Sequence, residues 1–144
     1  MAPQKGRTYL DWGCGANSKA LATVIEQGFD VWGFEPSIPQ STSTIINRRD
    51  AIRASFDGIF SNNVIEHFRD PIAQFKDFHG LLNDGGVMAH SSACCDYAYP
   101  FTRFHTLFLL GRSPHVLAER TGFIIKNVVR DSEYINYLFA KLPK

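Results

Sequence analysis

Residues 11–17 (DWGCGAN) combine a carboxylate with two closely spaced glycines, directly after a short apolar run. Glycines at alternate positions allow the backbone to turn sharply, and they let a ligand approach without a Cβ in the way. A helix that begins after such a turn presents free N–H groups, which suit an anionic group. The segment therefore indicates a ligand-binding turn, although a tight strand-to-helix turn with no ligand would use the same glycines.

A second acid, Glu35, ends the next apolar run, about twenty positions beyond Gly15. An acid at a strand tip can accept hydrogen bonds from two ribose hydroxyls, whereas the plainer interpretation is a solvated turn residue. A dinucleotide site needs a third glycine where this chain has Ser18, so an NAD-dependent oxidoreductase is disfavoured. Asp11 would repel a pyrophosphate and attract an ammonium group. The ligand implied has a ribose and an amino-acid-like head.

The elements that must position these residues alternate along the chain between apolar runs and amphipathic stretches. We expect strands at 8–10, 31–34, 56–61 and 87–89, and helices within 17–28, 70–82 and 113–122. The stretch 37–55 predicts a short helix and at most a very short third strand. Apolar runs at 123–129 and 134–140 predict a closing hairpin. This order predicts a doubly wound, mostly parallel α/β sheet with helices on both faces, in a single domain over residues 1–144.

The composition excludes several classes of protein. A chain of 144 residues can bury one core without staples, and a net charge of +1 carries no footprint of a nucleic-acid or membrane-surface binder. No apolar run approaches the roughly 20 residues that span a bilayer, and the first residues lack the apolar region of a secretory signal. Cys14, Cys94 and Cys95 show no CxxC spacing. We therefore expect a cytoplasmic protein with no nucleic-acid or membrane partner.

Three segments in order resemble the Rossmann-like (class I) S-adenosylmethionine-dependent methyltransferases. Residues 9–15 (YLDWGCG) look like the first motif of that family, residues 56–67 (FDGIFSNNVIEH) are similar to its fourth-strand segment, and residues 81–87 (LLNDGGV) to the turn before its fifth strand. The resemblance covers roughly residues 9–123, and the closing hairpin fits it. It implies S-adenosylmethionine as the cofactor, and the absence of a basic stripe favours a small-molecule methyl acceptor.

The resemblance also implies which residues hold the cofactor. The backbone of the glycine turn would line the methionine part, Asp11 would hold its amino group, Glu35 would take the ribose, and Asn62 would face the donor methyl. Asn17 replaces the family's third glycine, and Asp50 is the candidate for the acid that meets adenine. The expected cofactor-binding residues are Asp11, Gly13, Cys14, Gly15, Asn17, Glu35, Pro36, Asp50, Asn62 and Asn63. We expect the N-terminal helical cover of the family to be missing, which leaves room for a homodimer.

Methyl transfer from a sulfonium is an in-line displacement, so positioning suffices unless the acceptor must lose a proton. The candidate bases are His67, expected to open the helix after the fourth strand, and Tyr97 and His105 in the loop after the fifth. Each also has a plain interpretation as a capping or solvated residue. The histidine and cysteine spacings match no metal-ligand pattern, so no metal is expected. Cys14 is expected to pack rather than react. A catalytically degenerate methyltransferase-like binding module is the alternative function.

Overall fold

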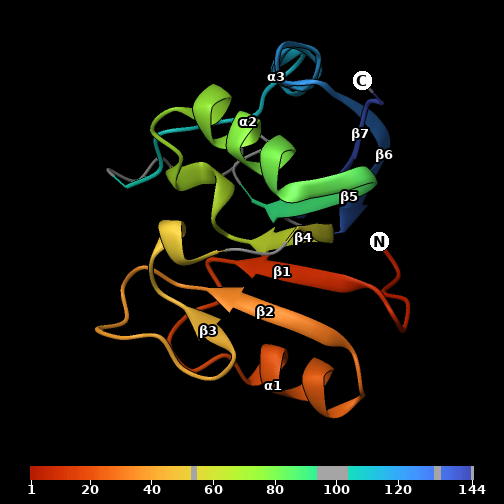
Figure 1. The fold of residues 1–144 in the computed structure, drawn as a ribbon. Helices are drawn as coiled ribbons and strands as arrows, with labels where there is room; N and C mark the ends of the chain where they lie inside the picture. The colour runs from red at the N-terminus through yellow and green to blue at the C-terminus, as the bar shows by residue number, and fades with distance from the viewer. Residues whose placement is uncertain (53–54, 94–103, 132–133, 144) are drawn as a thin grey trace.

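A computed structural model of the protein describes residues 1–52, 55–93, 104–131 and 134–143. These residues form one sheet whose strands are β1 (Thr8–Trp12), β2 (Asp30–Phe34), β3 (Ile45–Ile46), β4 (Phe56–Asn62), β5 (Leu82–Ser92), β6 (Phe123–Asp131) and β7 (Tyr134–Lys141). The strand order is β3-β2-β1-β4-β5-β7-β6 (Figure 1). The pairs from β3 to β5 are parallel, and β7 is antiparallel to both of its neighbours. The predicted doubly wound sheet with a C-terminal hairpin is confirmed.

Helices cover both faces of this sheet. The described residues form α1 (Lys19–Glu26), α2 (Pro71–Leu81) and α3 (Ser113–Thr121), and the short 3₁₀ turns η1 (Arg49–Ala51) and η2 (Ile65–His67). Helix α1 lies on one face, and α2 and α3 lie on the other (Figure 1). None of the helices in these ranges is long and apolar enough to cross a bilayer.

Local capping chemistry fixes where the helices begin. The Ser18 side chain accepts a hydrogen bond from the N–H of Leu21, so Ser18 rather than Asn17 caps α1. The Asp70 side chain accepts from the N–H of Ala73, and Pro71 occupies the first position of α2, where a missing N–H costs nothing. Together these two residues set the start of α2.

The structure differs from the sequence prediction in three places. His67 does not open the next helix: it ends η2, and α2 begins only at Pro71, after the Asp70 cap. Where a short helix was expected within 37–55, the described residues 37–52 and 55 form the 3₁₀ turn η1 and the two-residue strand β3. Strand β5 is longer than 87–89, because pairing with β4 continues through a bulge to the pair Phe56–Leu82.

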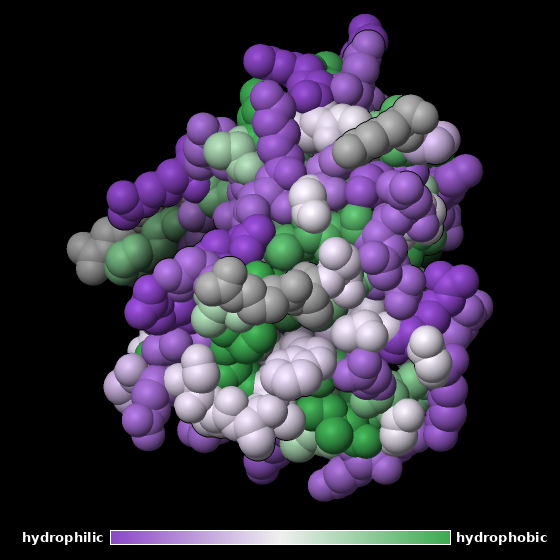
Figure 2. Space-filling model, in the orientation of Figure 1, coloured by the Kyte–Doolittle hydropathy of each residue, from purple (hydrophilic) through white to green (hydrophobic). Residues whose placement is uncertain are grey.

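Side chains that alternate along the strands divide the core into two layers. Leu10 and Ile59 point to the face under α2 and pack with Phe75 and Phe78. Side chains that point to the opposite face form the second layer, in which Tyr9, Val31 and Ile45 pack with Leu21 of α1. Figure 2 shows hydrophilic side chains over much of the rim of the molecule and apolar ones gathered toward its centre. Parallel strands buried in this way leave their carboxyl ends as the edge where ligands bind.

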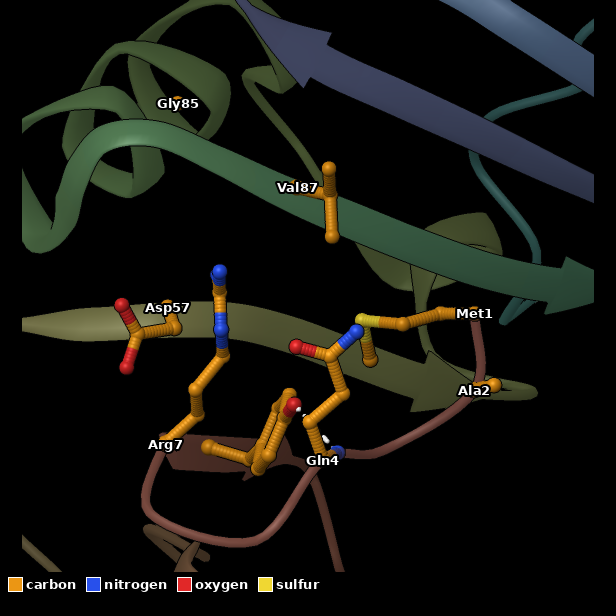
Figure 3. Close-up of a pocket in the computed structure, with 8 residues that line it drawn as sticks. Met1, Ala2, Gln4, Arg7, Asp57, Gly85 and Val87 are labelled. Carbon is orange, nitrogen blue, oxygen red and sulfur yellow. Dashed lines mark hydrogen bonds between the residues drawn. The ribbon is translucent and has the colours of Figure 1, made fainter.

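A hollow lies at the opposite edge, by the amino ends of β1 and β4 (Figure 3). The Asp57 carboxylate there accepts hydrogen bonds from the N–H of Thr8 at 3.0 Å and from Nδ2 of Asn83 at 3.2 Å. These two hydrogen bonds hold the pKa of Asp57 below its usual value. The hydroxyl of Tyr9 accepts from the N–H of Gln4 at 2.8 Å. The hydrogen bonds of Asp57 thus link the first residues of β1, β4 and β5. The edge where ligands are expected is the opposite one, at the carboxyl ends of the parallel strands.

His90 of β5 is a polar residue enclosed in the aromatic layer under α2. Its ring stacks on Phe78 and also lies against Phe75 and Phe139. Nδ1 lies 2.8 Å from the hydroxyl of Ser61, and among the described residues Nε2 has no hydrogen-bond partner. Complete burial lowers the pKa of His90 to about 3, so the ring is neutral in the folded protein.

We expect His90 to make folding sensitive to acid. Between pH 6.5 and about 3 the unfolded chain binds a proton here that the folded protein does not, so stability is present above pH 6.5 and is lost as the pH falls. In the double variant His90→Phe, Ser61→Ala, unfolding should take up one proton fewer at acid pH. The slope of the unfolding free energy against pH should therefore decrease by about 1.4 kcal/mol per pH unit. Urea unfolding between pH 7.5 and 4.5 measures this, with the exposed His115→Ala as control. An unchanged slope would contradict the assignment.

Candidate functional site

Backbone hydrogen bonds tie the carboxyl ends of β1 and β2 together. The N–H groups of Gly13 and Cys14 both donate to the carbonyl of Phe34, at 2.8 and 3.3 Å. Gly13 has a φ of 76°, and a Cβ there would lie 2.6 Å from Cγ2 of Val64. Glycine is therefore required at this position for two reasons: the backbone is left-handed, and a side chain would collide with the segment after β4. The turn is held against three strand ends.

The Glu35 carboxylate joins the turn after β1 to the loop after β2. Oε2 accepts a hydrogen bond from the N–H of Gly15 at 2.9 Å, and Oε1 accepts from the N–H of Ser37 at 3.0 Å. Partial burial alone would raise the pKa of Glu35, but the hydrogen bonds from Ser37 and Gly15 outweigh it and hold the pKa below its usual value. Glu35 is thus a fixed anionic acceptor at the tip of β2.

Gly15 is open on the side where a side chain would project. Its φ is 79°, and a Cβ at this position would meet no atom within 4 Å. The glycine therefore exposes backbone to free space beside the Glu35 carboxylate, as a ligand-binding turn requires.

Asp11 places a second carboxyl group beside Glu35. Burial, followed by the negative charge of Glu35, raises the pKa of Asp11 to about 6. The same influences, burial first and then Asp11 and Glu35, raise the pKa of the Cys14 thiol to about 12, which keeps it protonated. This fits the packing role expected for Cys14. The two carboxyl groups make the turn a favourable place for a cationic group.

Three other predicted residues lie on loops at the same edge of the sheet. Asn17 and Pro36 are exposed, in the loops that follow β1 and β2. Asp50 lies in η1, after β3, and its carboxylate forms a two-pronged ion pair with the exposed guanidinium of Arg48. None of these three shares a hydrogen bond with the Gly15–Glu35 pair.

The two asparagines at the end of β4 have different surroundings. Asn62 is exposed at the end of the strand. Asn63 has a φ of 55°, its N–H donates to the carbonyl of Ser91, and its Nδ2 donates to the hydroxyl of Tyr134 at 3.1 Å. The Asn63 side chain is therefore engaged with the C-terminal hairpin, and the structure does not bring it together with Glu35.

The predicted histidines do meet, and they meet an acid that sequence reasoning missed. The rings of His67 and His105 pack edge to face with centroids 5.0 Å apart. Glu66 is buried, and its Oε2 accepts a hydrogen bond from the hydroxyl of Ser92 at 2.9 Å. One potential ligand atom from each of Glu66, His67 and His105 lies within 4.8 Å of the others. A single acid inside the apolar run after β4 carries no spacing pattern, so the sequence offered no signal for Glu66. Tyr97 lies outside the described residues.

Comparisons with known proteins agree with this geometry. A family model described as "Methyltransferase domain" matches residues 1–123. No curated protein matches the chain. A solved S-adenosylmethionine-dependent methyltransferase from Mesorhizobium loti is 16% identical with a TM-score of 0.70, over 98% of this chain and 94% of that one.

Two further solved structures carry S-adenosylhomocysteine. The 1,6-didemethyltoxoflavin-N1-methyltransferase from Burkholderia thailandensis is 17% identical with a TM-score of 0.75, over 96% of this chain and 72% of that one. The magnesium protoporphyrin IX methyltransferase from Synechocystis PCC 6803 is 13% identical with a TM-score of 0.66, over 95% and 75%. At these identities the likeness is one of fold.

Asp11→Asn is expected to stabilise the unliganded protein. Between pH 3.8 and about 6 the folded protein keeps a proton on Asp11 that the unfolded chain has released, so stability falls as the pH rises through this range. The amide cannot ionise, and the variant should gain about 1–3 kcal/mol at pH 8 and less at pH 5. Chemical denaturation without ligand measures the gain. The exposed Glu119→Gln should show none, and an equal gain at both pH values would contradict the burial of charge at Asp11.

Proposed function

Because this chain belongs to the methyltransferase domain family, we propose that it transfers the methyl group of S-adenosylmethionine to a small-molecule acceptor. The observation that carries the proposal is the hydrogen bond between Gly15 and the Glu35 carboxylate, with the Asp11 carboxyl beside it. Two solved neighbours with bound S-adenosylhomocysteine support the choice of cofactor.

The chemistry of the turn suits the two ends of this cofactor. Each carboxylate oxygen of Glu35 accepts one backbone hydrogen bond and keeps a lone pair, so both can also accept from ribose hydroxyls. In this proposal the ammonium group of the methionine part binds next to Asp11. Its positive charge there lowers the free-energy cost of ionising the Asp11 carboxyl group. The sulfonium charge benefits from the same two acids. Gly13, Cys14, Asn17, Pro36, Asp50, Asn62 and Asn63 complete the proposed cofactor-binding set.

The transfer step needs no acid from the protein. A lone pair of the acceptor forms a bond to the methyl carbon while the carbon–sulfur bond breaks, and sulfur keeps the electron pair to give neutral S-adenosylhomocysteine. Holding the two reactants in line therefore provides most of the catalysis. His67 and His105 stand on the acceptor side in this proposal, and Tyr97, which follows β5 in the sequence, is the third candidate base.

A small acceptor accords with the charge of the chain and with the neighbours. The net charge of +1 offers no electrostatic attraction for nucleic acid. The neighbours named above act, by their names, on 1,6-didemethyltoxoflavin and on magnesium protoporphyrin IX. A single domain, a cytoplasmic location and a homodimer belong to the proposal as expected from the sequence.

Glu35→Ala should weaken S-adenosylhomocysteine binding by about 1–3 kcal/mol, because it strands the hydrogen-bonding groups of the ribose and of Gly15. Isothermal titration calorimetry measures the affinity. The matched control is Glu26→Ala, which removes an exposed glutamate at the end of α1 and should bind like the wild type. Unchanged affinity in Glu35→Ala would remove this residue from the site. A radiolabelled-methyl assay over a metabolite panel then separates an enzyme from a binding module.

Gly15→Ala and Gly85→Ala form a second matched pair. Both glycines have φ values near +75°, at 79° and 75°, and neither would place a Cβ within 4 Å of another atom. Each substitution should cost about 1–2 kcal/mol of stability through the left-handed backbone. We expect only Gly15→Ala to reduce S-adenosylhomocysteine affinity, since only Gly15 lies in the proposed cofactor-binding turn, where its N–H donates to Glu35 and a methyl group would enter the open space. Equal affinity in the two variants would show that the ligand does not contact this turn.

A further inference from the structure

We propose that Glu66, His67 and His105 form a binding site for a divalent first-row transition-metal ion. One ligand atom from each side chain lies within 4.8 Å of the others. An ion about 2.1 Å from each ligand holds neighbouring ligand atoms roughly 3–3.5 Å apart. His67 is exposed and His105 half-buried, so small rotations of the two rings close the remaining distance.

Glu66 supplies the negative charge and is held rigidly. Its side chain is only 2% exposed, and among the described residues it forms no ion pair. A buried carboxylate is costly unless a cation or several donors compensate it. The hydroxyl of Ser92 donates to Oε2 at 2.9 Å, which leaves Oε1 as the atom for a cation. The hydrogen bond from Ser92 orients the carboxylate in the way that metal-binding carboxylates are oriented.

The hydrogen bond at His67 selects the ring nitrogen that binds metal. Nδ1 lies 3.0 Å from the carbonyl oxygen of Phe104. Because a carbonyl only accepts, Nδ1 must carry the proton, and Nε2 then presents its lone pair. Metal-bound histidines commonly donate their second ring nitrogen to a backbone carbonyl in this manner.

The segment that carries His105 is fixed against the turn η2. The carbonyl oxygen of Glu66 accepts hydrogen bonds from the N–H groups of Thr106 at 2.8 Å and Leu107 at 3.1 Å. The backbone on both sides of the trio is therefore set before any ion binds. The His67–His105 ring contact shows that these two side chains already face one another.

The ligand set indicates the class of metal. Two imidazoles and one carboxylate suit zinc, manganese, iron(II) or cobalt, whereas calcium and magnesium prefer oxygen ligands alone. This site revises the expectation of no metal. No spacing pattern revealed it, because its ligands come from two segments that only folding brings together.

The role of the ion, unlike its binding, rests on the proposed function. Three protein ligands leave open coordination positions, at the ends of β4 and β5 and next to the turn where Val64 contacts Gly13. An acceptor hydroxyl bound there would have its pKa lowered, so that it would release its proton to solvent water before its oxygen attacks the methyl carbon. His67 and His105 would then act through the ion rather than as free bases.

The test titrates chelator-treated protein with Mn²⁺, Co²⁺, Zn²⁺ and Mg²⁺ in separate calorimetric experiments, with visible absorption recorded for Co²⁺. We expect one transition-metal ion per chain, a Co²⁺ absorption band, and weaker binding of Mg²⁺. His67→Ala and His105→Ala should each reduce transition-metal affinity at least tenfold and weaken the Co²⁺ band. The control His115→Ala removes an exposed histidine of α3 and should bind like the wild type.

Absence of saturable binding by all three transition metals would overturn the site, as would equal affinity in His67→Ala, His105→Ala and the control. Glu66→Gln keeps the shape of the buried side chain but removes its charge, so it should also weaken transition-metal binding. If this variant does not fold, the two histidine variants still test the site. S-adenosylhomocysteine affinity, measured in the same samples, should stay within twofold of the wild type. Metal binding without cofactor binding would defeat the proposed function alone, and the reverse result would defeat this site alone.

Discussion

The pairing of β1 with β2 forces two carboxyl groups together at the carboxyl ends of these strands. The parallel register sets Asp11 beside Gly33 and Trp12 beside Phe34, so Glu35 emerges next to the turn that follows Asp11. The fold treats the two acids unequally. Glu35 receives two backbone N–H groups and stays ionised, whereas Asp11 is buried beside that charge and holds its proton to about pH 6. The unliganded protein thus stores electrostatic free energy that a cationic ligand can release.

The parts of the fold that sequence reasoning predicted well are those set by local chemistry. The glycine turn after β1 and the helix that follows it depend on residues within a few positions of each other. Strand, turn, helix and strand leave few ways to connect adjacent parallel strands, so the ends of β1 and β2 were expected side by side, whereas the hydrogen bond from Gly15 to Glu35 was not predicted. His67 was misplaced for a local reason too, because the Asp70 cap and Pro71 start α2 beyond it.

Contacts between segments that are distant in the chain could not be predicted from the sequence. Asn63 is proposed to bind the cofactor, and nothing in the sequence indicated that its side chain also donates a hydrogen bond to Tyr134 on β7, because only the finished sheet brings these two residues together. Glu66 was overlooked since a single acid in an apolar run carries no pattern. Its meaning depends on Ser92 and on the backbone of Thr106, which lie on separate elements. The candidate site is thus half local, at β1 and β2, and half assembled by the fold, at β4 and β5.

The position of β7 bears on how the protein is made. This strand follows β6 in the chain but lies between β5 and β6, and β6 has no other partner strand in the described sheet. During synthesis on the ribosome, β6 emerges first and must wait without backbone partners until β7 has left the exit tunnel. The edge of β5 is exposed over the same interval. The nascent chain therefore passes through a stage in which β6 is unpaired and one edge of β5 is open, and strands in this state are prone to aggregate.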